Sequence, residues 1–349
     1  MCIMFSSTYR SNILVLLFGF CLTLTLFSHE QVTLFSSNST ISPNQIEVTD
    51  LGYPVASINS RSVSDVSKTI TTTTVTSTKK VDSFWTSLSA ELKLDHKTQS
   101  KSVQNEIRKL LADQAKLNSI LEAAAPYIYF IDQQRKARGL PAELALIPVI
   151  ESEFNPNDHS NKGATGLWQL MPRTATDLGM KVKSGYDGRR NVISSTNGAL
   201  AYFNDLGNVF KGNWYLAIAA YNCGEVRIQS AIRRAGDRNF WNLKVPKETQ
   251  YYVPKLLAVA AIIKNPEKYG VVLPTLSNQP YFEELHIKKP VQLKQIAKSS
   301  GTDFKTLQTL NPDYNHTTVV PNKKGAYILL VPVNKASQIK EHLVNSVLS

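Results

Sequence analysis

Apolar and polar residues divide the chain into an apolar beginning, a polar stretch, a long segment of helical periodicity and a short mixed end. Residues 13–27 are apolar except for Thr, Cys and one Gly, which is typical of the core of a signal peptide. The run is shorter than the roughly 20 residues that a spanning helix needs. We therefore assign residues 1–28 to a signal peptide or an N-terminal membrane anchor, and the sequence leaves both open.

The next part of the chain, residues 29–81, is rich in Ser and Thr and poor in large apolar side chains, as in SKTITTTTVTSTKK. Low-complexity composition of this kind is typical of a tether without a packed core. We interpret residues 29–81 as a flexible linker.

Apolar residues recur at helical spacing over residues 82–275, and we expect a nearly all-α domain there. Pro126 should kink or divide a helix over residues 118–138. Pro141 should begin the next helix at its first position. Further helices are expected from Pro172 to Leu178, from a Ser194 or Ser195 cap through Leu206, from an Asn213 cap to Gly224, and over residues 225–235 and 247–264.

The character of the chain changes after Pro280. The strand-like patterns FEELHI and AYILLVPV flank a helical pattern, which predicts a β-helix-helix-β unit over residues 281–349. A unit of this size is a marginal fold by itself. The predicted fold class is therefore mainly α, with a small α+β unit at the C-terminus.

Composition narrows the partners of the chain. The formal net charge of +12 and the pI of about 9.4 favour polyanionic surroundings, with a solvated basic surface as the alternative. No zinc-finger, RNP-type or basic-region motif is visible, so we expect no nucleic acid partner. Only Cys223 lies beyond residue 21, which excludes a disulfide within the folded part. The histidines lack metal-ligand spacing, so we expect no metal and no cofactor.

Glu151 is the candidate catalytic residue. It continues the apolar stripe of Leu144, Ile147 and Pro148 at helical spacing, and burial there would raise its pKa. A carboxylic acid that is still protonated near neutral pH can donate its proton to a leaving oxygen. Because no second carboxylate lies in a strong pattern nearby, a single-glutamate mechanism requires that the substrate supply the nucleophile. The alternative is a structural pair between Glu151 and an arginine.

The segment after Glu151 predicts a glycine-rich loop that could lie over the carboxylate. Gly163 and Gly166 allow tight turns in this loop, and Trp168 and Gln169 follow the two glycines. Trp168 could stack on a sugar or pack in the core, and core packing is the commoner use of a large aromatic side chain.

Five motifs together resemble the lytic transglycosylases of the soluble-lytic-transglycosylase type. They are ELALIPVIESEFNP, GATGLWQLMPRTA, DGRRNV, AIAAYNCGE and KETQYYVPKLLA, and the resemblance covers about residues 82–270. It implies a goose-lysozyme-like helical fold and cleavage of peptidoglycan between N-acetylmuramic acid and N-acetylglucosamine, which leaves a 1,6-anhydro end. Residues 285–333 resemble a degenerate LysM unit, and either glycan binding or a structural wing on the catalytic domain would fit it.

The resemblance also implies roles for single residues. Glu151 would be the acid and then the base, and the muramic acid 6-hydroxyl would be the nucleophile. The hydroxyl of Tyr221 would orient Glu151. The remaining positions implied to bind substrate are Ser160, Gln169, Met171, Asn222, Glu248 and Tyr252.

These inferences describe a monomeric enzyme at the periplasmic face of a Gram-negative cell envelope. Its partners would be peptidoglycan glycan strands and, through the N-terminal segment, a membrane. A goose-type lysozyme that adds water and a non-catalytic peptidoglycan-binding protein are the rival functions.

Overall fold

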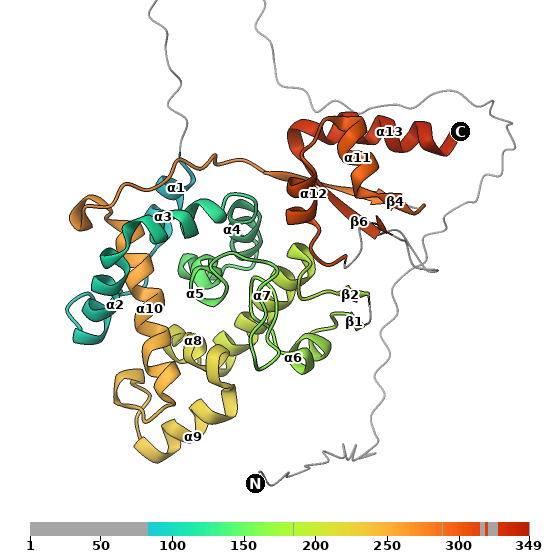
Figure 1. Ribbon diagram of the computed structural model, residues 1–349. Helices are drawn as coiled ribbons and strands as arrows, with labels where there is room; N and C mark the ends of the chain where they lie inside the picture. Colours follow the sequence, from blue (N-terminus) through green and yellow to red (C-terminus); the bar gives the residue numbers. More distant parts are fainter. Residues whose placement is uncertain (1–82, 184, 288, 315–317, 320–326, 349) are drawn as a thin grey trace, which may run out of the picture. The chain divides into compact units, whose positions relative to one another are not determined.

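The computed structural model describes residues 83–183, 185–287, 289–314, 318–319 and 327–348 (Figure 1). The predicted signal peptide or anchor and the predicted linker lie outside the described residues. Within the described part of the chain, no helix has the length and apolar character needed to cross a membrane.

Residues 83–270 form a helical domain. Its α-helices are α1 (Phe84–Glu91), α2 (Lys101–Ala112), α3 (Gln114–Ala123), α4 (Ile128–Lys136), α5 (Ile147–Glu151), α6 (Pro172–Asp177), α7 (Val192–Val209), α8 (Trp214–Cys223), α9 (Glu225–Ala235) and α10 (Lys247–Lys264). The 3₁₀ helices are η1 (Ala142–Leu146), η2 (Phe240–Asn242) and η3 (Glu267–Tyr269), and the short strands β1 (Val182–Lys183) and β2 (Tyr186–Asp187) pair with each other.

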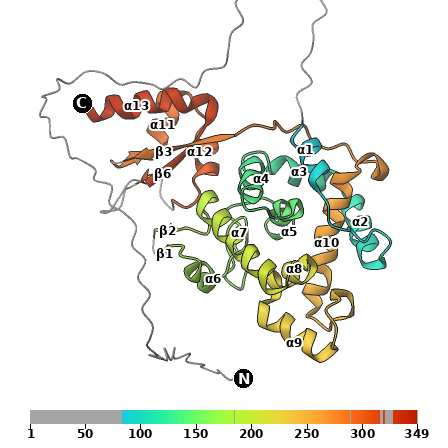
Figure 2. The same cartoon turned by 180° about the vertical axis from the view of Figure 1, so that it is seen from behind.

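Helix α10 is the centre of this domain. It contacts α1, α2, α5, α8 and η1, and Figures 1 and 2 show it between α2 and α8 from opposite sides. Nearly all of its residues from Tyr252 to Ile263 are buried. Pro254 lies inside the helix, seven residues after its first residue, so the helix lacks one main-chain hydrogen bond at this position. The α10 residues therefore form the inner wall against which the other helices pack.

Local sequence signals set most of the helix boundaries. Helix α3 ends at Ala123 and α4 begins at Ile128, so Pro126 divides the predicted helix as expected. Asn213 caps α8 and Gly224 ends it, as predicted. The expected cap of α7 is wrong. Asn191, rather than Ser194 or Ser195, accepts the capping hydrogen bond, from the main-chain N–H of Ser194 at 2.8 Å.

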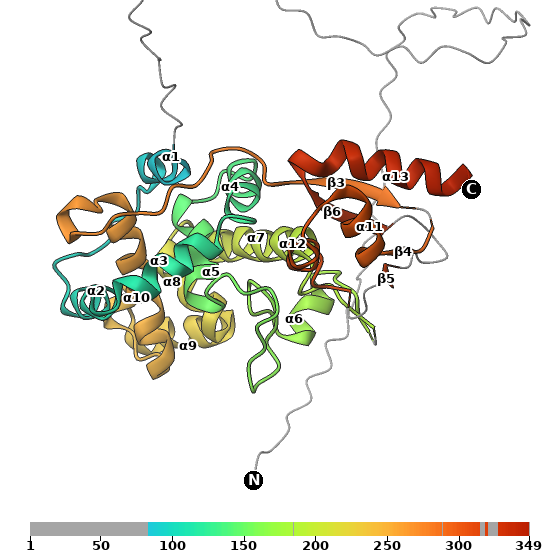
Figure 3. The ribbon, with the colours of Figure 1, turned by 45° about the horizontal axis from the view of Figure 1, so that its top comes forward.

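The C-terminal unit contains the predicted β-helix-helix-β arrangement. Strand β3 (Phe282–Ile287) pairs antiparallel with β6 (Tyr327–Pro332), and α11 (Leu293–Ser300) and α12 (Phe304–Leu310) lie between them in the sequence. A second pair joins β4 (Val291–Gln292) and β5 (Thr318–Val319), and η4 (Val333–Lys335) precedes the last helix. That helix, α13 (Ala336–Leu348), was not predicted, and it runs beside β6 and α11 (Figure 3). The predicted fold class is confirmed.

The C-terminal unit shares apolar contacts with the helical domain. Phe282, Leu310 and Leu330 belong to the same buried cluster as the helix residues. The rings of Phe130 and Phe282 lie 5.4 Å apart, and the Tyr127 hydroxyl donates to the carbonyl of Thr309. The predicted domain limits, 82–275 and 281–349, stay predictions.

The cap at Asn213 provides a test of the local signals. Replacing Asn213 by Ala removes the acceptor for the Leu216 N–H, and we expect a loss of about 1 kcal/mol in the free energy of unfolding, measured by urea titration. Ser83 at the start of α1 makes no side-chain capping bond, so Ser83→Ala is the matched control. Equal losses in the two variants would contradict this account of the cap.

Candidate active site

Glu151 is the last residue of a short helical stretch that the sequence builds from apolar residues. Residues 142–149 of η1 and α5 are buried, and Glu151 is partly buried at their end. The chain then turns sharply, because Glu153 and Phe154 have φ values of 51° and 59°. The turn directs the chain away from α5, and the Ser152 hydroxyl donates to the carbonyl of Leu167 at 2.9 Å. The segment that carries Glu151 is thus joined to the glycine-rich loop.

The Tyr252 hydroxyl donates to Oε1 of Glu151 at 2.5 Å. Burial raises the pKa of Glu151 to about 7, although the hydrogen bond from Tyr252 and the positive charge of Lys255 act in the opposite direction. The negative charge of Glu248 adds to the rise. A carboxyl group with this pKa is half protonated near neutral pH, which suits both donation and acceptance of a proton.

The contact expected of Tyr221 is made instead by Tyr252. The Tyr221 hydroxyl donates to the main-chain carbonyl of Trp168 at 2.8 Å, and its ring stacks on Phe203 at 4.3 Å. Tyr221 therefore holds the glycine-rich loop rather than the carboxylate. Both tyrosines lie near Glu151. They differ in the direction of the side chain and so in the partner of the hydroxyl, which their positions in the sequence do not reveal.

Trp168 packs in the core, in agreement with the commoner reading of this residue. Its side chain is 0% exposed, and its indole N–H donates to the Thr196 hydroxyl at 3.1 Å. It is therefore a fixed point of the loop and is not available to stack on a ligand in this structure.

The loop from Ser160 to Leu170 is closed by its own hydrogen bonds. The hydroxyl of Ser160 accepts from the N–H of Ala164 at 3.0 Å. Thr165 and Leu170 pair through their main chains, and the Gln169 amide donates to the carbonyl of Gly166 at 2.9 Å. The backbone of Gln169 has a φ of 46°, so the chain turns at the same residue whose side chain donates to Gly166. Ser160 and Gln169 thus shape the loop.

Arg189, from the motif DGRRNV, was not among the predicted site residues. It is 6% exposed, and its Nη1 donates to the carbonyls of Gly163 at 2.6 Å and Leu170 at 3.1 Å. Its Nε and Nη2 are held by both carboxylate oxygens of Asp187. The signal that could have identified it is an aspartate two residues before an arginine in a polar loop. Asp187 is therefore the ion-pair partner of Arg189.

Gly166 lies against the main chain of Arg189. A Cβ atom on Gly166 would lie 2.1 Å from the carbonyl oxygen of Arg189, and the φ of Gly166 is +86°. Both facts require glycine at this position.

Asn222 and Glu248 form a polar group at the start of α10. The Asn222 amide donates to Oε1 of Glu248 at 3.2 Å and accepts from the Thr249 hydroxyl at 2.7 Å. Lys162 of the loop lies 3.7 Å from Glu248, with both side chains exposed. Since surface pairs contribute little to stability, Glu248 is available to other partners.

The structure thus brings Glu151, Tyr252, Tyr221, Asn222 and Glu248 together. Met171 lies at the other end of the loop, just before α6, with 42% of its surface exposed. No arginine pairs with Glu151 among the described residues, which removes the structural alternative for this carboxylate. Nor do the described residues contain a group of three or more His, Cys, Asp or Glu side chains that could hold a metal ion.

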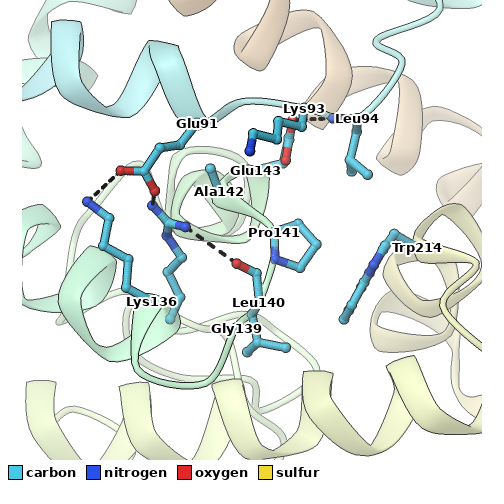
Figure 4. A pocket seen from close by; sticks show the side chains of 11 residues that line it. Glu91, Lys93, Leu94, Lys136, Gly139, Leu140, Pro141, Ala142, Glu143 and Trp214 are labelled. Atoms are coloured by element: carbon cyan, nitrogen blue, oxygen red, sulfur yellow. Dashed lines mark hydrogen bonds and ion pairs between the residues drawn. The ribbon is translucent and has the colours of Figure 1, made fainter.

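A cavity of about 420 Å³ lies at the beginning of η1 rather than at the end of α5. Lys93, Lys136, Pro141, Glu143 and Trp214 are among the residues that line it (Figure 4). None of the predicted site residues does so, and we assign no role in the chemistry of Glu151 to this cavity.

Comparison with known proteins agrees with the motifs. Residues 128–244 match the family model "Transglycosylase SLT domain", and residues 281–346 match "Lytic transglycosylase MltD, LysM-like domain". Membrane-bound lytic murein transglycosylase D of Escherichia coli (strain K12) is 35% identical over 266 residues, which are 75% of this chain and 58% of that protein. The chain therefore spans less than two thirds of the length of this relative.

Two further proteins are similar over shorter parts. A protein of Alteromonas sp. (strain M-1), named for tributyltin chloride resistance, is 40% identical over 185 residues, which are 48% of this chain and 89% of that protein. The crystal structure of the 70 kDa soluble lytic transglycosylase of Escherichia coli is 25% identical with a TM-score of 0.37, and the match covers 49% of this chain and 32% of that one.

The close approach at Gly166 leads to a prediction about the loop. Gly166→Ala places a methyl group against the Arg189 carbonyl, whereas Gly163, at a similar φ of +90°, has nothing within 4 Å of its added Cβ. We expect Gly166→Ala to lower the free energy of unfolding by about 2 kcal/mol more than Gly163→Ala does, measured by urea titration. Equal losses would mean that the loop and Arg189 separate easily.

Proposed function

Because the chain belongs to the lytic transglycosylases that have an SLT domain, we propose that it cleaves the β-1,4 bond between N-acetylmuramic acid and N-acetylglucosamine in peptidoglycan. The product is a 1,6-anhydromuramoyl end. The observation that carries the proposal is the carboxyl group of Glu151, with its pKa raised to about 7 by burial and with one hydroxyl partner from Tyr252. The family is the one that the motifs predicted.

Glu151 acts first as an acid. Its proton passes to the glycosidic oxygen while the bond from that oxygen to C1 of the muramic acid breaks, and the bonding electron pair stays on the leaving oxygen. Burial supports this step, because it keeps a fraction of Glu151 protonated near neutral pH.

Glu151 then acts as a base. The carboxylate accepts the proton of the muramic acid 6-hydroxyl as that oxygen forms a bond to C1, which closes the anhydro ring and regenerates the acid. Tyr252 supports this step, since its hydroxyl stabilises the charged carboxylate. No second carboxylate is needed, because the nucleophile belongs to the substrate.

The remaining predicted residues bind and orient the glycan in this proposal. Asn222 and Glu248 supply an amide and an exposed carboxylate for the substrate's amide groups. Ser160, Gln169 and Met171 contribute through the loop, whose shape is set by the hydrogen bonds of Ser160 and Gln169. Tyr221 holds the loop through Trp168.

The proposed setting is the periplasmic face of a Gram-negative cell envelope, where peptidoglycan lies. Attachment to a membrane through residues 1–28 would agree with the name of the Escherichia coli relative, which calls that protein membrane-bound. The net charge of +12 would favour an anionic polymer as partner. We propose that the enzyme works as a monomer without a cofactor.

Replacing Glu151 by Gln tests the central residue. The amide cannot donate a carboxylic proton, so release of anhydro-muropeptides from purified sacculi should fall at least about 100-fold while the circular dichroism spectrum stays that of the wild type. Glu153→Gln is the matched control, because Glu153 lies two residues further on, is exposed, and forms an exposed ion pair with Lys116. It should retain wild-type activity.

Mass spectrometry of the same digests separates the rival functions. An anhydro product is one water lighter than the reducing end that a lysozyme would leave. Reducing ends from the wild type would establish a hydrolase, and sacculus binding without any product would establish a binding protein. Full activity in Glu151→Gln would contradict the assignment of the acid.

Replacing Tyr252 by Phe tests the electrostatics of the site. The hydrogen bond from Tyr252 lowers the pKa of Glu151, so its removal raises that pKa further. Since the protonated carboxyl is the active acid, kcat/KM falls as the pH rises through about 7 in the wild type, and the midpoint of this fall should move to higher pH in Tyr252→Phe. Tyr251→Phe, at an exposed neighbour, should leave the midpoint unchanged. An unshifted or lowered midpoint in Tyr252→Phe would contradict the role of the hydroxyl.

A further inference from the structure

One corner of the C-terminal unit, formed by Asp313 and Tyr314, packs against the helical domain. Asp313 is 1% exposed, and its Oδ2 accepts from the side-chain amide of Asn191 at 2.9 Å. Its main-chain carbonyl accepts from the N–H of Asp187 at 3.5 Å. Tyr314 pairs with Tyr186 through an antiparallel bridge, and their rings lie 6.0 Å apart. The corner thus contacts both ends of the segment Tyr186–Asn191.

The same segment holds the loop beside Glu151. Asp187 fixes the guanidinium group of Arg189, and Arg189 binds the carbonyls of Gly163 and Leu170. Arg189 also presents its own carbonyl to Gly166 without room for a side chain between them. The segment and the loop are therefore joined by two hydrogen bonds and one close main-chain contact.

Asn191 provides a second connection. Its side-chain oxygen caps α7, while its side-chain N–H₂ group donates to Asp313. Helix α7 carries Thr196, which binds the indole of Trp168 within the loop. One amide thus joins the C-terminal unit to the helix behind the loop.

We infer that Asp313 is a positioning residue for the active site. Through Asn191 and Asp187 it holds the segment Tyr186–Asn191, and through Arg189 it holds the loop 160–170 in the shape that binds the glycan. The inference rests on the proposed function for its effect on catalysis. It gives the C-terminal unit a part in the site of the helical domain, whether or not this unit binds glycan itself.

Asp313 can order the segment because Asn191 depends on it for a hydrogen-bond acceptor. Without the Asp313 carboxylate, the Asn191 amide keeps its capping bond but loses its acceptor in a partly buried place, which is unfavourable unless the segment moves to find water. Arg189 is restrained by Asp187 in that segment, so its two bonds to the loop weaken together. Glu151 and Tyr252 lie on α5 and α10, and the hydrogen bond between them does not pass through Arg189 or the loop.

Hydrogen exchange followed by mass spectrometry tests, in the full-length protein, whether Asp313 orders the loop 160–170. In Asp313→Ala, the amides of Thr165 and Leu170, which bond to each other's carbonyls at 3.2 Å, should exchange about tenfold faster than in the wild type. The amides of α10 should keep their wild-type rates, which shows that the whole fold is not loosened. Glu283→Ala is the control, because it removes an exposed ion pair with Lys340 in the same C-terminal unit. Wild-type exchange in residues 160–170 of Asp313→Ala would overturn the inference.

Kinetics on soluble glycan strands test whether Asp313 affects the binding of substrate. KM should rise about fivefold in Asp313→Ala while kcat stays within about twofold, because the loop binds substrate and Glu151 performs the chemistry. Asp313→Asn keeps an acceptor oxygen for Asn191 and should restore most of the affinity. The midpoint of the fall in kcat/KM at high pH should be the same in all three proteins.

A double-mutant cycle separates positioning from general damage. If Asp313 acts through Arg189, the effects of Asp313→Ala and Arg189→Ala on kcat/KM are not additive. Additive effects, or an unchanged KM in Asp313→Ala, would overturn the inference. A wild type that releases no anhydro product would refute the proposed function instead, and the exchange rates would still decide whether Asp313 orders the loop.

Discussion

A hydrogen bond from the hydroxyl of Tyr252 to the carboxyl group of Glu151 joins two residues that lie 101 positions apart. Burial makes the charged carboxylate unfavourable, and this one hydroxyl restores part of the lost solvation. The balance keeps the pKa of Glu151 at about 7, far above that of an exposed glutamate. Acid and base forms of a single residue are then both accessible, which a mechanism with one catalytic carboxylate requires.

The packing of α10 keeps this hydrogen bond in place. The helix is buried along most of its length and contacts α1, α2, α5 and α8, so its residues are fixed on several sides. Tyr252 can hold Glu151 at one distance because α10 cannot shift without disturbing that packing. The loop over the other side of the site is held differently. It depends on polar contacts of Arg189, Tyr221 and Ser152 with its carbonyl groups.

A rigid helix and a loop held by polar contacts suit different tasks. Proton transfer requires a fixed distance, whereas binding of a polymer strand requires a surface that is ordered but adjustable. The buried arginine is a strong device for such a loop, because a guanidinium group donates to several carbonyls in one plane. Asp187 compensates its charge, so the buried arginine is paired.

Several features could be predicted from the sequence: the helical class, most helix ends, the division at Pro126, the β-helix-helix-β unit, the family and the candidacy of Glu151. These properties follow from local periodicity, caps and motifs, which act over a few residues. Other features are visible only in the folded chain: Tyr252 rather than Tyr221 contacts Glu151, Asp187 pairs with Arg189, and Asp313 lies against Asn191. Such choices depend on side-chain orientation and on contacts between distant segments, and the spacing of residues along a chain does not contain that information.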